Sequence, residues 1–181
     1  MKDFEYEIDD DTATITRYMG AGGAVTVPGT LGGFSIDGIG EEAFYGCTGL
    51  TSITLPNSLT RIETGAFEGC TGLTSITLPN GITDIGHGAF WGCTGLTSIT
   101  LPASVTTIED YAFYGCTGLT SITLPNSLTT IREWAFAGCT NLISIILPDS
   151  ITTIGQYAFS RCTSLTCRTL DAIAMLRRPA L

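Results

Sequence analysis

The sequence predicts an α/β solenoid, a curved arc of stacked coils with a parallel β-sheet on the concave side and short helical turns on the convex side. Three observations predict this fold. Six cysteines, from Cys47 to Cys162, are each separated by 23 residues. Five consecutive segments between Leu50 and Ser164 repeat one apolar pattern with the same period. The core of the pattern is LxxIxL, and a period of about 20–29 residues with this core is typical of leucine-rich-repeat solenoids.

Each coil is expected to contain a strand, a second extended piece and a helical turn. In the first full coil the strand is Thr51–Leu55, where β-branched residues alternate between the interior and the solvent. Pro56 ends the strand because it has no N–H to donate to the ladder, and Leu59–Ile62 is the second extended piece. The helical turn is expected around Gly65–Gly69. Its phenylalanine recurs in every coil, and the copies are expected to form one interior column beside the cysteines: Phe44, Phe67, Phe90, Phe113, Phe136 and Phe159.

Three segments are predicted along the chain. Residues 1–24 form an N-terminal cap, because residues 4–18 alternate apolar and polar positions around an acidic turn, as a β-hairpin does. Residues 25–170 form the solenoid, whose first coil contains an irregular loop at residues 29–37. Residues 171–181 form a helical tail that either caps the last coil or mediates an oligomer contact, since an open coil end must be covered.

Composition excludes several classes of function. The formal net charge is −9 with only eight basic residues, so the chain lacks the clustered Lys and Arg that a nucleic-acid partner requires. No apolar run of about 18 residues predicts a membrane span, and no signal peptide is recognisable. The even spacing of the cysteines indicates a structural role, because zinc sites need closely spaced pairs. The acidic stretch Asp9–Asp11 is expected to be a solvated turn, because no spaced calcium loop follows it.

Candidate catalytic groups do not converge. The only histidine, His87, is expected to be a polar surface residue, because its repeat position holds other polar residues elsewhere. A pairing of His87 with Cys70 or Cys93 would need a thiol that the repeat buries. No GxxxxGK[ST] phosphate loop occurs among the glycines. We therefore predict no catalytic residues, no metal and no cofactor.

Comparison of the coils defines two candidate partner-binding surfaces, because positions that vary between coils are not fixed by stacking. The sheet face carries small hydroxyl side chains in four coils and two isoleucines in the last full coil. Its residues are Thr51, Ser52, Thr54, Thr74, Ser75, Thr77, Thr97, Ser98, Thr100, Thr120, Ser121, Thr123, Ile143 and Ile146. The turn side gathers aromatic residues in the later coils: Trp91, Tyr111, Tyr114, Trp134 and Tyr157. Each surface also has a structural interpretation, since β-branched hydroxyl residues suit an exposed sheet and rings can seal the groove between coils.

The pattern LxxIxLPxxLxxIxxxAFxxCxx, as it stands in residues 50–72, resembles the BspA-like or Treponema-type leucine-rich repeats. The resemblance covers roughly residues 13–166, and the opening ATITRYMGAGGAVTVP is similar to the entry segment of that family. Proteins of this type are typically bacterial or protozoan surface or secreted molecules that bind host proteins or other cells. The resemblance therefore implies adhesion or binding and a secreted or cell-surface location.

We predict a non-enzymatic protein that binds a protein or glycan partner, with specificity carried by the variable turn side. A structural stalk or scaffold is the main alternative, because the coils are nearly identical. Ice binding is a third hypothesis, since a threonine ladder offers a regular hydroxyl lattice, but it needs a flat sheet instead of an arc. The chain is expected to be a monomer, or a weak oligomer through its C-terminal tail.

Overall fold

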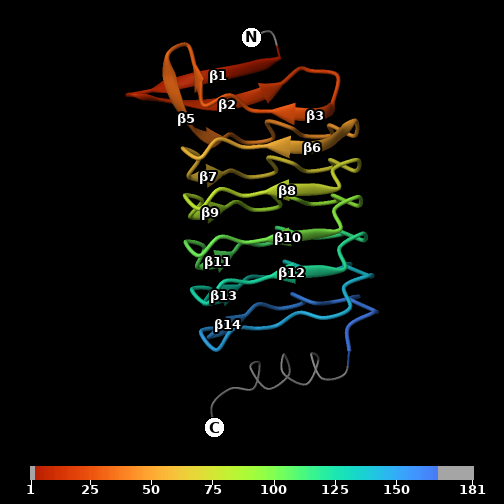
Figure 1. The fold of residues 1–181 in the computed structure, drawn as a ribbon. Helices are drawn as coiled ribbons and strands as arrows, with labels where there is room; N and C mark the ends of the chain where they lie inside the picture. Colours follow the sequence, from red (N-terminus) through yellow and green to blue (C-terminus); the bar gives the residue numbers. More distant parts are fainter. Residues whose placement is uncertain (1–2, 167–181) are drawn as a thin grey trace.

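The computed structural model describes residues 3–166, which form a β-solenoid of stacked coils (Figure 1). Each coil contributes to three faces. They are termed the sheet face, the short-strand face and the turn face, and each is built from one segment of every coil. Within the described residues no helix is long and apolar enough to cross a membrane. The tail predicted at residues 171–181 lies outside the described residues.

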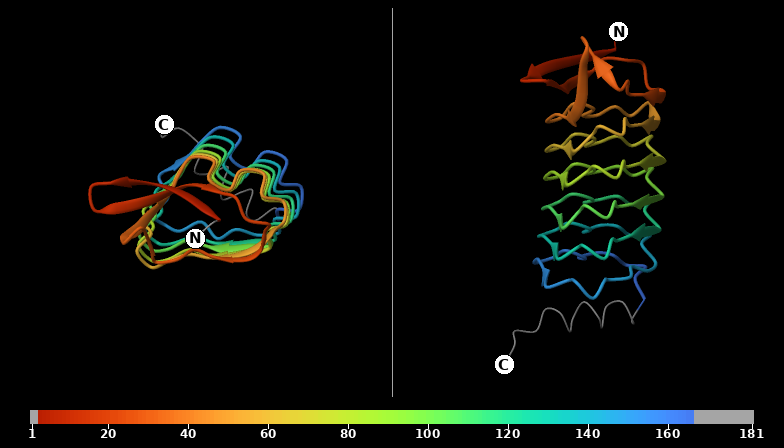
Figure 2. Two further views of the ribbon diagram at one scale, coloured as in Figure 1. Left: turned by 90° about the horizontal axis from the view of Figure 1, so that it is seen from above. Right: turned by 60° about the vertical axis from the view of Figure 1, so that its left-hand side comes forward.

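An antiparallel hairpin covers the N-terminal end of the stack. It consists of β1 (Phe4–Asp9) and β2 (Thr12–Tyr18), as the alternation in residues 4–18 predicted. β2 pairs in parallel with β5 (Phe34–Ile39), and β4 (Thr30–Leu31) folds back on β5 in the irregular loop. Figure 2 shows the hairpin lying across the first coil and projecting beyond the edge of the stack.

The sheet face is a five-stranded parallel sheet in the order β12-β10-β8-β6-β3. Its strands are β3 (Gly23–Thr26), β6 (Leu50–Thr54), β8 (Ser75–Thr77), β10 (Ser98–Thr100) and β12 (Ser121–Thr123). Equivalent residues of neighbouring coils pair, as Ile53 does with Ile76. Because pairing follows the repeat, the buried isoleucines stack inside and the hydroxyl residues beside them stay in register outside.

The short-strand face consists of two-residue strands after the proline of each coil. They are β7 (Arg61–Ile62), β9 (Asp84–Ile85), β11 (Thr107–Ile108), β13 (Thr130–Ile131) and β14 (Thr153–Ile154). β5, β7 and β9 belong to the sheet that begins at the hairpin, and β11, β13 and β14 form a separate sheet. The carbonyl of Pro56 accepts the N–H of Leu59 at 3.2 Å, so the proline ends one strand and makes the bend to the next.

The predicted helical turns are absent, because no helix occurs in residues 3–166. Alternate N–H groups of the turn face donate to the next coil: Gly65 to the carbonyl of His87 at 2.9 Å, Phe67 to Ala89 at 2.8 Å and Gly69 to Trp91 at 2.7 Å. The N–H groups of Ala66 and Glu68, which lie between them, donate three residues back in their own coil. An α-helix needs each N–H to bond four residues back, so the coil-to-coil bonds compete with it and tight turns result.

The coils stack in a nearly straight column with a small offset from one to the next, as the side views of Figures 1 and 2 show. The prediction of a curved arc with concave and convex sides is therefore wrong. An arc arises when helices, about 10–12 Å wide, line one side and strands about 4.8 Å apart line the other. Here each face is built from strands or turns, most of which are hydrogen-bonded to the next coil, and no face in residues 3–166 is lined by the wider helices.

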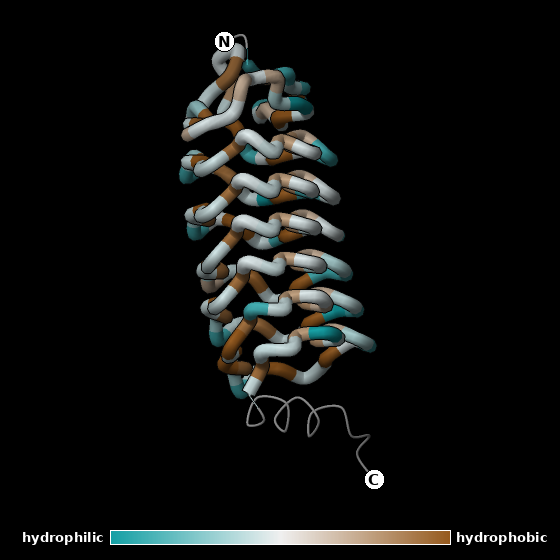
Figure 3. Tube along the Cα trace, turned by 90° about the vertical axis from the view of Figure 1, so that its right-hand side faces the viewer, coloured by the Kyte–Doolittle hydropathy of each residue, from teal (hydrophilic) through white to brown (hydrophobic). Residues whose placement is uncertain are grey.

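Columns of identical side chains fill the interior, and in Figure 3 the hydrophobic segments of successive coils lie above one another. The phenylalanine rings stack from Phe44 to Phe159 with centroid distances of 5.0–5.4 Å between neighbours. Tyr18 of β2 lies 5.0 Å from Phe44 and continues the column into the hairpin. Beside it the thiols donate to carbonyl oxygens, as Cys93 does to Phe67 at 3.1 Å. The predicted columns of phenylalanine and cysteine are confirmed.

Candidate functional site

One position of the turn face has a left-handed backbone in every coil, and aromatic residues occupy it in the last three. In chain order these residues are Glu42, Gly65, Gly88, Tyr111, Trp134 and Tyr157, with φ between 54° and 60°. The left-handed conformation brings the Cβ of an L-residue close to the following carbonyl oxygen and costs about 1–2 kcal/mol, a strain that glycine avoids. Three aromatic residues are therefore held here against the local preference of their backbone.

The rings of Trp91, Tyr111, Tyr114, Trp134 and Tyr157 form one continuous cluster, which we term the aromatic stripe. Tyr111 stacks on Trp91 at a centroid distance of 5.2 Å and on Trp134 at 6.3 Å. Trp134 stacks in turn on Tyr157 at 4.5 Å. The ring of Tyr114 is tilted against the three rings nearest to it, at 5.0–6.4 Å. The structure thus brings together all five aromatic residues that the sequence placed on the turn side.

The stripe is partly open to solvent. Tyr157 is 52% exposed, and the other four members are half-buried. Stacking covers the faces of the rings, so the solvent meets mainly ring edges, where the indole N–H and phenol O–H groups lie. The exposed side chain of His87 rests against Tyr111 at a centroid distance of 5.2 Å, so it is a polar surface residue as the repeat alignment indicated.

The hydroxyl side chains of the sheet face serve the stacking in part. The Oγ1 atoms of Thr74, Thr97 and Thr120 donate to the carbonyl oxygen of the threonine one coil earlier, at 3.1–3.3 Å. The other two hydroxyl residues of the strand, such as Ser75 and Thr77, are exposed to solvent. One of the three predicted positions in each coil therefore has a structural use, and two present hydroxyl groups outward.

The last full coil interrupts the sheet face. Residues 143–146 form no strand, and Ile143 and Ile146 are 55% and 84% exposed. A hollow of about 300 Å³ separates this segment from β12, and its lining includes Thr123 and Pro148. Both isoleucines of the predicted sheet surface are therefore exposed apolar side chains, and Ile146 lines the hollow.

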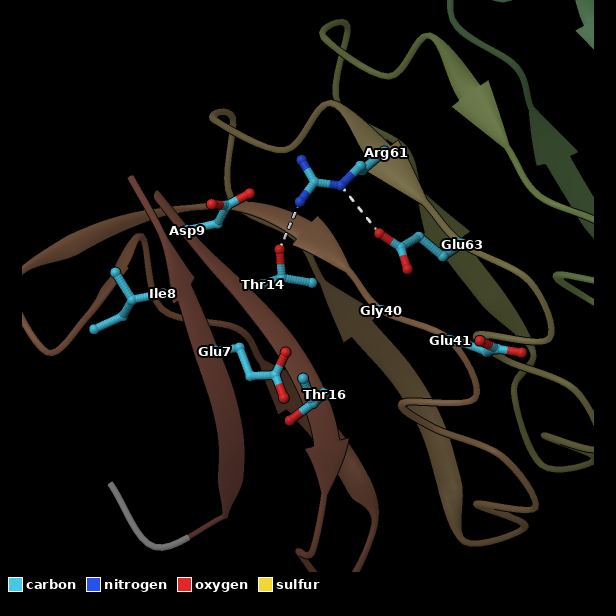
Figure 4. A pocket seen from close by; sticks show the side chains of 9 residues that line it. All are labelled: Glu7, Ile8, Asp9, Thr14, Thr16, Gly40, Glu41, Arg61 and Glu63. Carbon is cyan, nitrogen blue, oxygen red and sulfur yellow. Dashed lines mark hydrogen bonds and ion pairs between the residues drawn. The ribbon is translucent and has the colours of Figure 1, made fainter. Parts of the chain in front are cut away.

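A larger hollow, of about 530 Å³, lies where the hairpin meets the first full coil (Figure 4). Arg61 of β7 points into it and donates from Nη2 to Thr14 Oγ1 at 2.6 Å and from Nε to Glu63 Oε1 at 3.1 Å. Its Nη1 forms an ion pair with Asp37 Oδ2 at 2.6 Å. These contacts join β2, β5 and β7, so Arg61 fastens the hairpin to the solenoid. No group of three or more His, Cys, Asp or Glu side chains within residues 3–166 is arranged to hold a metal ion.

Comparison with protein families and solved structures agrees with this architecture. The family model of the BspA type leucine rich repeat region matches residues 37–166 in six copies. The chain belongs to this family. Among solved structures, the BspA-type chain is similar to the leucine-rich repeat protein of T. pallidum, with 32% identity and a TM-score of 0.82 over 98% of this chain and 94% of that one. No catalytic family is indicated by these matches.

Two longer relatives share the BspA-type fold. A leucine-rich cell surface protein of Faecalibacterium prausnitzii is 33% identical, with a TM-score of 0.70 over 92% of this chain and 52% of that one. The pneumococcal vaccine antigen PcpA is 25% identical, with a TM-score of 0.68 over 92% of this chain and 47% of that one. The chain spans about half the length of these two proteins. No curated protein matches it.

The buried thiols of the BspA-type coils are weakly reactive near neutral pH. Burial raises the pKa of Cys70 to about 12 and that of Cys162 to about 11. Burial likewise raises the pKa of Cys116 well above its ordinary value. Because the thiolate is the nucleophilic form of cysteine, the buried column is not prepared for nucleophilic chemistry near neutral pH.

Sequence reasoning missed two features of the BspA-type chain. It did not detect the left-handed position of the turn, although Gly65 and Gly88 share a column with Tyr111 and repeated glycine is a signal of positive φ. It also missed the contact between Arg61 and Asp37. Asp37 is the last residue of the irregular loop at residues 29–37, and the repeat alignment assigns no coil position to that loop.

Proposed function

We propose that the chain is a non-enzymatic binding protein and that the aromatic stripe is the surface that contacts its partner. The observation that carries the proposal is the presence of Tyr111, Trp134 and Tyr157 at left-handed backbone positions. Strained backbone that persists in a fold is found preferentially where function needs it.

Stacking of the coils does not require aromatic side chains at this position. The N–H of Gly65 donates to the carbonyl of His87 at 2.9 Å, and the N–H of Trp134 donates to the carbonyl of Gln156 at 3.1 Å. The coil-to-coil bond is therefore made with glycine and with tryptophan alike. Trp134 makes three ring pairs of about 0.5–1.5 kcal/mol each, and about 1–2 kcal/mol of left-handed strain opposes them. Strain therefore offsets much of the stability that the rings add, and partner binding supplies a further reason to keep them.

The chemistry of the stripe suits recognition of a protein. Tryptophan and tyrosine are enriched at interaction hot spots, because a rigid ring contributes large contact area and a polar group at its edge. Stacking on both neighbours fixes the rings before a partner arrives, which lowers the entropy lost on binding. The F. prausnitzii relative is described as a cell surface protein and PcpA as a vaccine antigen, which supports the extension to contacts outside the cell and to adhesion.

Arrays of proteins and glycans, probed with the intact chain and two matched variants, test this proposal. The stripe variant carries Trp91→Ala, Tyr114→Ala and Trp134→Ala. The sheet-face variant carries Thr77→Ala, Thr100→Ala and Thr123→Ala. Circular dichroism checks that each variant is folded. We expect the stripe variant to lose affinity by about tenfold or more and the sheet-face variant to stay within about twofold. Binding that survives in the stripe variant and disappears in the sheet-face variant overturns the proposal.

A stalk or scaffold is the second candidate, and the nearly straight column favours it. This role predicts that neither variant loses a partner. Ice binding by the sheet face, the third hypothesis, needs a flat sheet, and the nearly straight column meets this condition. A measurement of thermal hysteresis tests it. A hysteresis that the sheet-face variant abolishes would assign the function to the hydroxyl ladder instead of the stripe.

A further inference from the structure

The turn face carries carboxylates beside the aromatic stripe that form no ion pair among residues 3–166. We term Glu42, Glu68, Asp110 and Glu133 the acidic rim. Glu42 and Glu68 converge over Gly65, because a Cβ atom added to this glycine would lie 3.3 Å from Glu42 Cγ and 3.4 Å from Glu68 Oε2. Burial, and then the charge of Glu42, raise the pKa of Glu68. The two carboxyl groups are thus close enough to interact at the end of the face that precedes the stripe.

The other two members of the rim adjoin the rings themselves. Asp110 directly precedes Tyr111, and Glu133 directly precedes Trp134. Asp110 Oδ1 accepts the N–H of Glu133 at 2.8 Å, which holds these two residues of successive coils together. The acidic side chains therefore run along the same coils as the stacked rings.

The basic side chains of residues 3–166 form no ion pair with the rim. Arg61 forms ion pairs with Asp37 and Glu63, and Arg132 forms one with Glu109 at 2.8 Å. No ion pair among the described residues reaches a member of the rim. Three other basic side chains lie near the turn face. Arg17 of β2 lines a hollow together with Glu42, His87 rests on Tyr111 and favours the charged form of Glu68, and Arg161 follows Ser160 in the last described coil. Asp110 and Glu133, the rim members beside the rings, therefore keep their negative charge, in a chain whose net charge is −9.

We propose that the partner of the aromatic stripe presents an extended, basic segment of a protein, with arginine or lysine side chains that contact the acidic rim. This inference rests on the proposed function of the stripe and names the chemistry of its partner. A guanidinium group pairs with carboxylates through two hydrogen bonds, and it can also pack on Tyr157, which is 52% exposed and whose ring stacks on one neighbour among the described residues. It therefore fits both components of the surface. From Glu42 to Tyr157 the face spans five coil steps of about 4.8 Å, which matches about seven residues of an extended chain.

Fluorescence offers a readout specific to this site, because Trp91 and Trp134 are the only two tryptophans of the chain and both belong to the stripe. The probes are three peptides of alternating glycine with arginine, glutamate or glutamine, titrated into the full chain. We expect the arginine peptide alone to change the tryptophan emission. Its affinity should fall by about tenfold when the salt concentration rises from about 0.05 to 0.5 M, since added ions screen exposed charges.

Two charge-matched variants separate the rim from the general field of an acidic protein. The rim variant carries Asp110→Asn and Glu133→Gln, and the control carries Glu5→Gln and Asp9→Asn in the exposed hairpin strand β1. We expect the rim variant to bind the arginine peptide about fivefold or more weakly and the control to stay within about twofold. Equal losses in both variants, or an equal response to all three peptides, overturn the inference.

The experiments distinguish failure of the basic-partner proposal from failure of the proposed function. If the array partner is lost in the stripe variant but binds the rim variant normally, the stripe still binds and only the basic character of the partner is wrong. A partner that proves to be a neutral glycan has the same consequence. If neither the stripe variant nor the rim variant affects any ligand, both proposals fall.

Discussion

Replacing Trp134 by glycine is expected to destabilise the protein less than replacing it by alanine. At most positions the order is the reverse, because glycine loses more backbone entropy on folding than alanine, by about 0.5–1 kcal/mol. Trp134 has a φ of 56°, where alanine is strained by about 1–2 kcal/mol and glycine is not. The difference leaves the glycine variant ahead of the alanine variant by about 0.5–1 kcal/mol.

Both variants lose the contacts of the indole ring. Trp134 stacks on Tyr157 at 4.5 Å and on Tyr111 at 6.3 Å, and each ring pair contributes about 0.5–1.5 kcal/mol. We therefore expect the free energy of unfolding to fall by about 1–3 kcal/mol in Trp134→Ala and by less in Trp134→Gly. Urea unfolding followed by circular dichroism measures both values. The fluorescence of Trp91, the remaining tryptophan, gives a second probe of the same transition.

Ala137 provides the control, because it belongs to the same turn but has no left-handed backbone. Ala137→Gly is expected to be destabilising by about 1 kcal/mol, the opposite sign to the glycine preference at Trp134. If Trp134→Ala proves as stable as Trp134→Gly while Ala137→Gly behaves as expected, the aromatic residues are not strained. Stability alone would then account for the aromatic residues of the stripe.

Three further changes test the fold. Arg61→Met should lower the free energy of unfolding by about 1–3 kcal/mol, because Asp37 loses its partner. Hydrogen exchange should become faster mainly in residues 4–18. Unchanged exchange there would contradict the role of Arg61 in holding the hairpin to the solenoid. Because the pKa of Cys70 is raised to about 12 from 9.0, its contribution to stability is complete below pH 9 and is lost as the pH rises toward 12. Unfolding free energy measured over this range should fall less steeply in Cys70→Ala, by up to about 1.4 kcal/mol per pH unit, and parallel slopes would count against the burial argument. Asn141→Gly should slow hydrogen exchange at residues 143–146 by letting the last full coil approach its neighbour, and unaltered exchange would show that the gap has another cause.

The strands and the interior columns could be predicted because one set of apolar positions repeats in every coil. A strand at Thr51–Leu55 follows from the alternation around Ile53, and stacking of identical coils fixes its register. The turn around Phe67 could not be predicted in the same way. Its residues are compatible with a helical turn, and the outcome depends on where the N–H groups of Gly65 and Gly69 find acceptors, which lie in the next coil. The straightness of the column follows from that same non-local choice.

The aromatic stripe was accessible to sequence reasoning only as a set of residues. The alignment placed Tyr111 and Trp134 in one column and Tyr114 beside them, so their proximity follows from the repeat. It did not give the backbone conformation, because φ is a property of the folded turn. The distinction between a ring that seals a groove and a ring held under strain depends on that angle.

The apolar hollow on the sheet face depends on Asn141 as well as on the isoleucines of the last full coil. At three of the glycines equivalent to Asn141, an added Cβ would lie 2.3–2.5 Å from a threonine carbonyl oxygen of the preceding coil: Gly72, Gly95 and Gly118. Asn141 carries a Cβ, for which such a close approach leaves no room. Two residues later, the N–H of Ile143 reaches the carbonyl of Thr120 at 3.3 Å, whereas the four equivalent bonds measure 3.0–3.2 Å, and no strand follows. We therefore expect the loss of a glycine to widen the hollow beside Ile146, and the change from threonine to isoleucine makes the opening apolar.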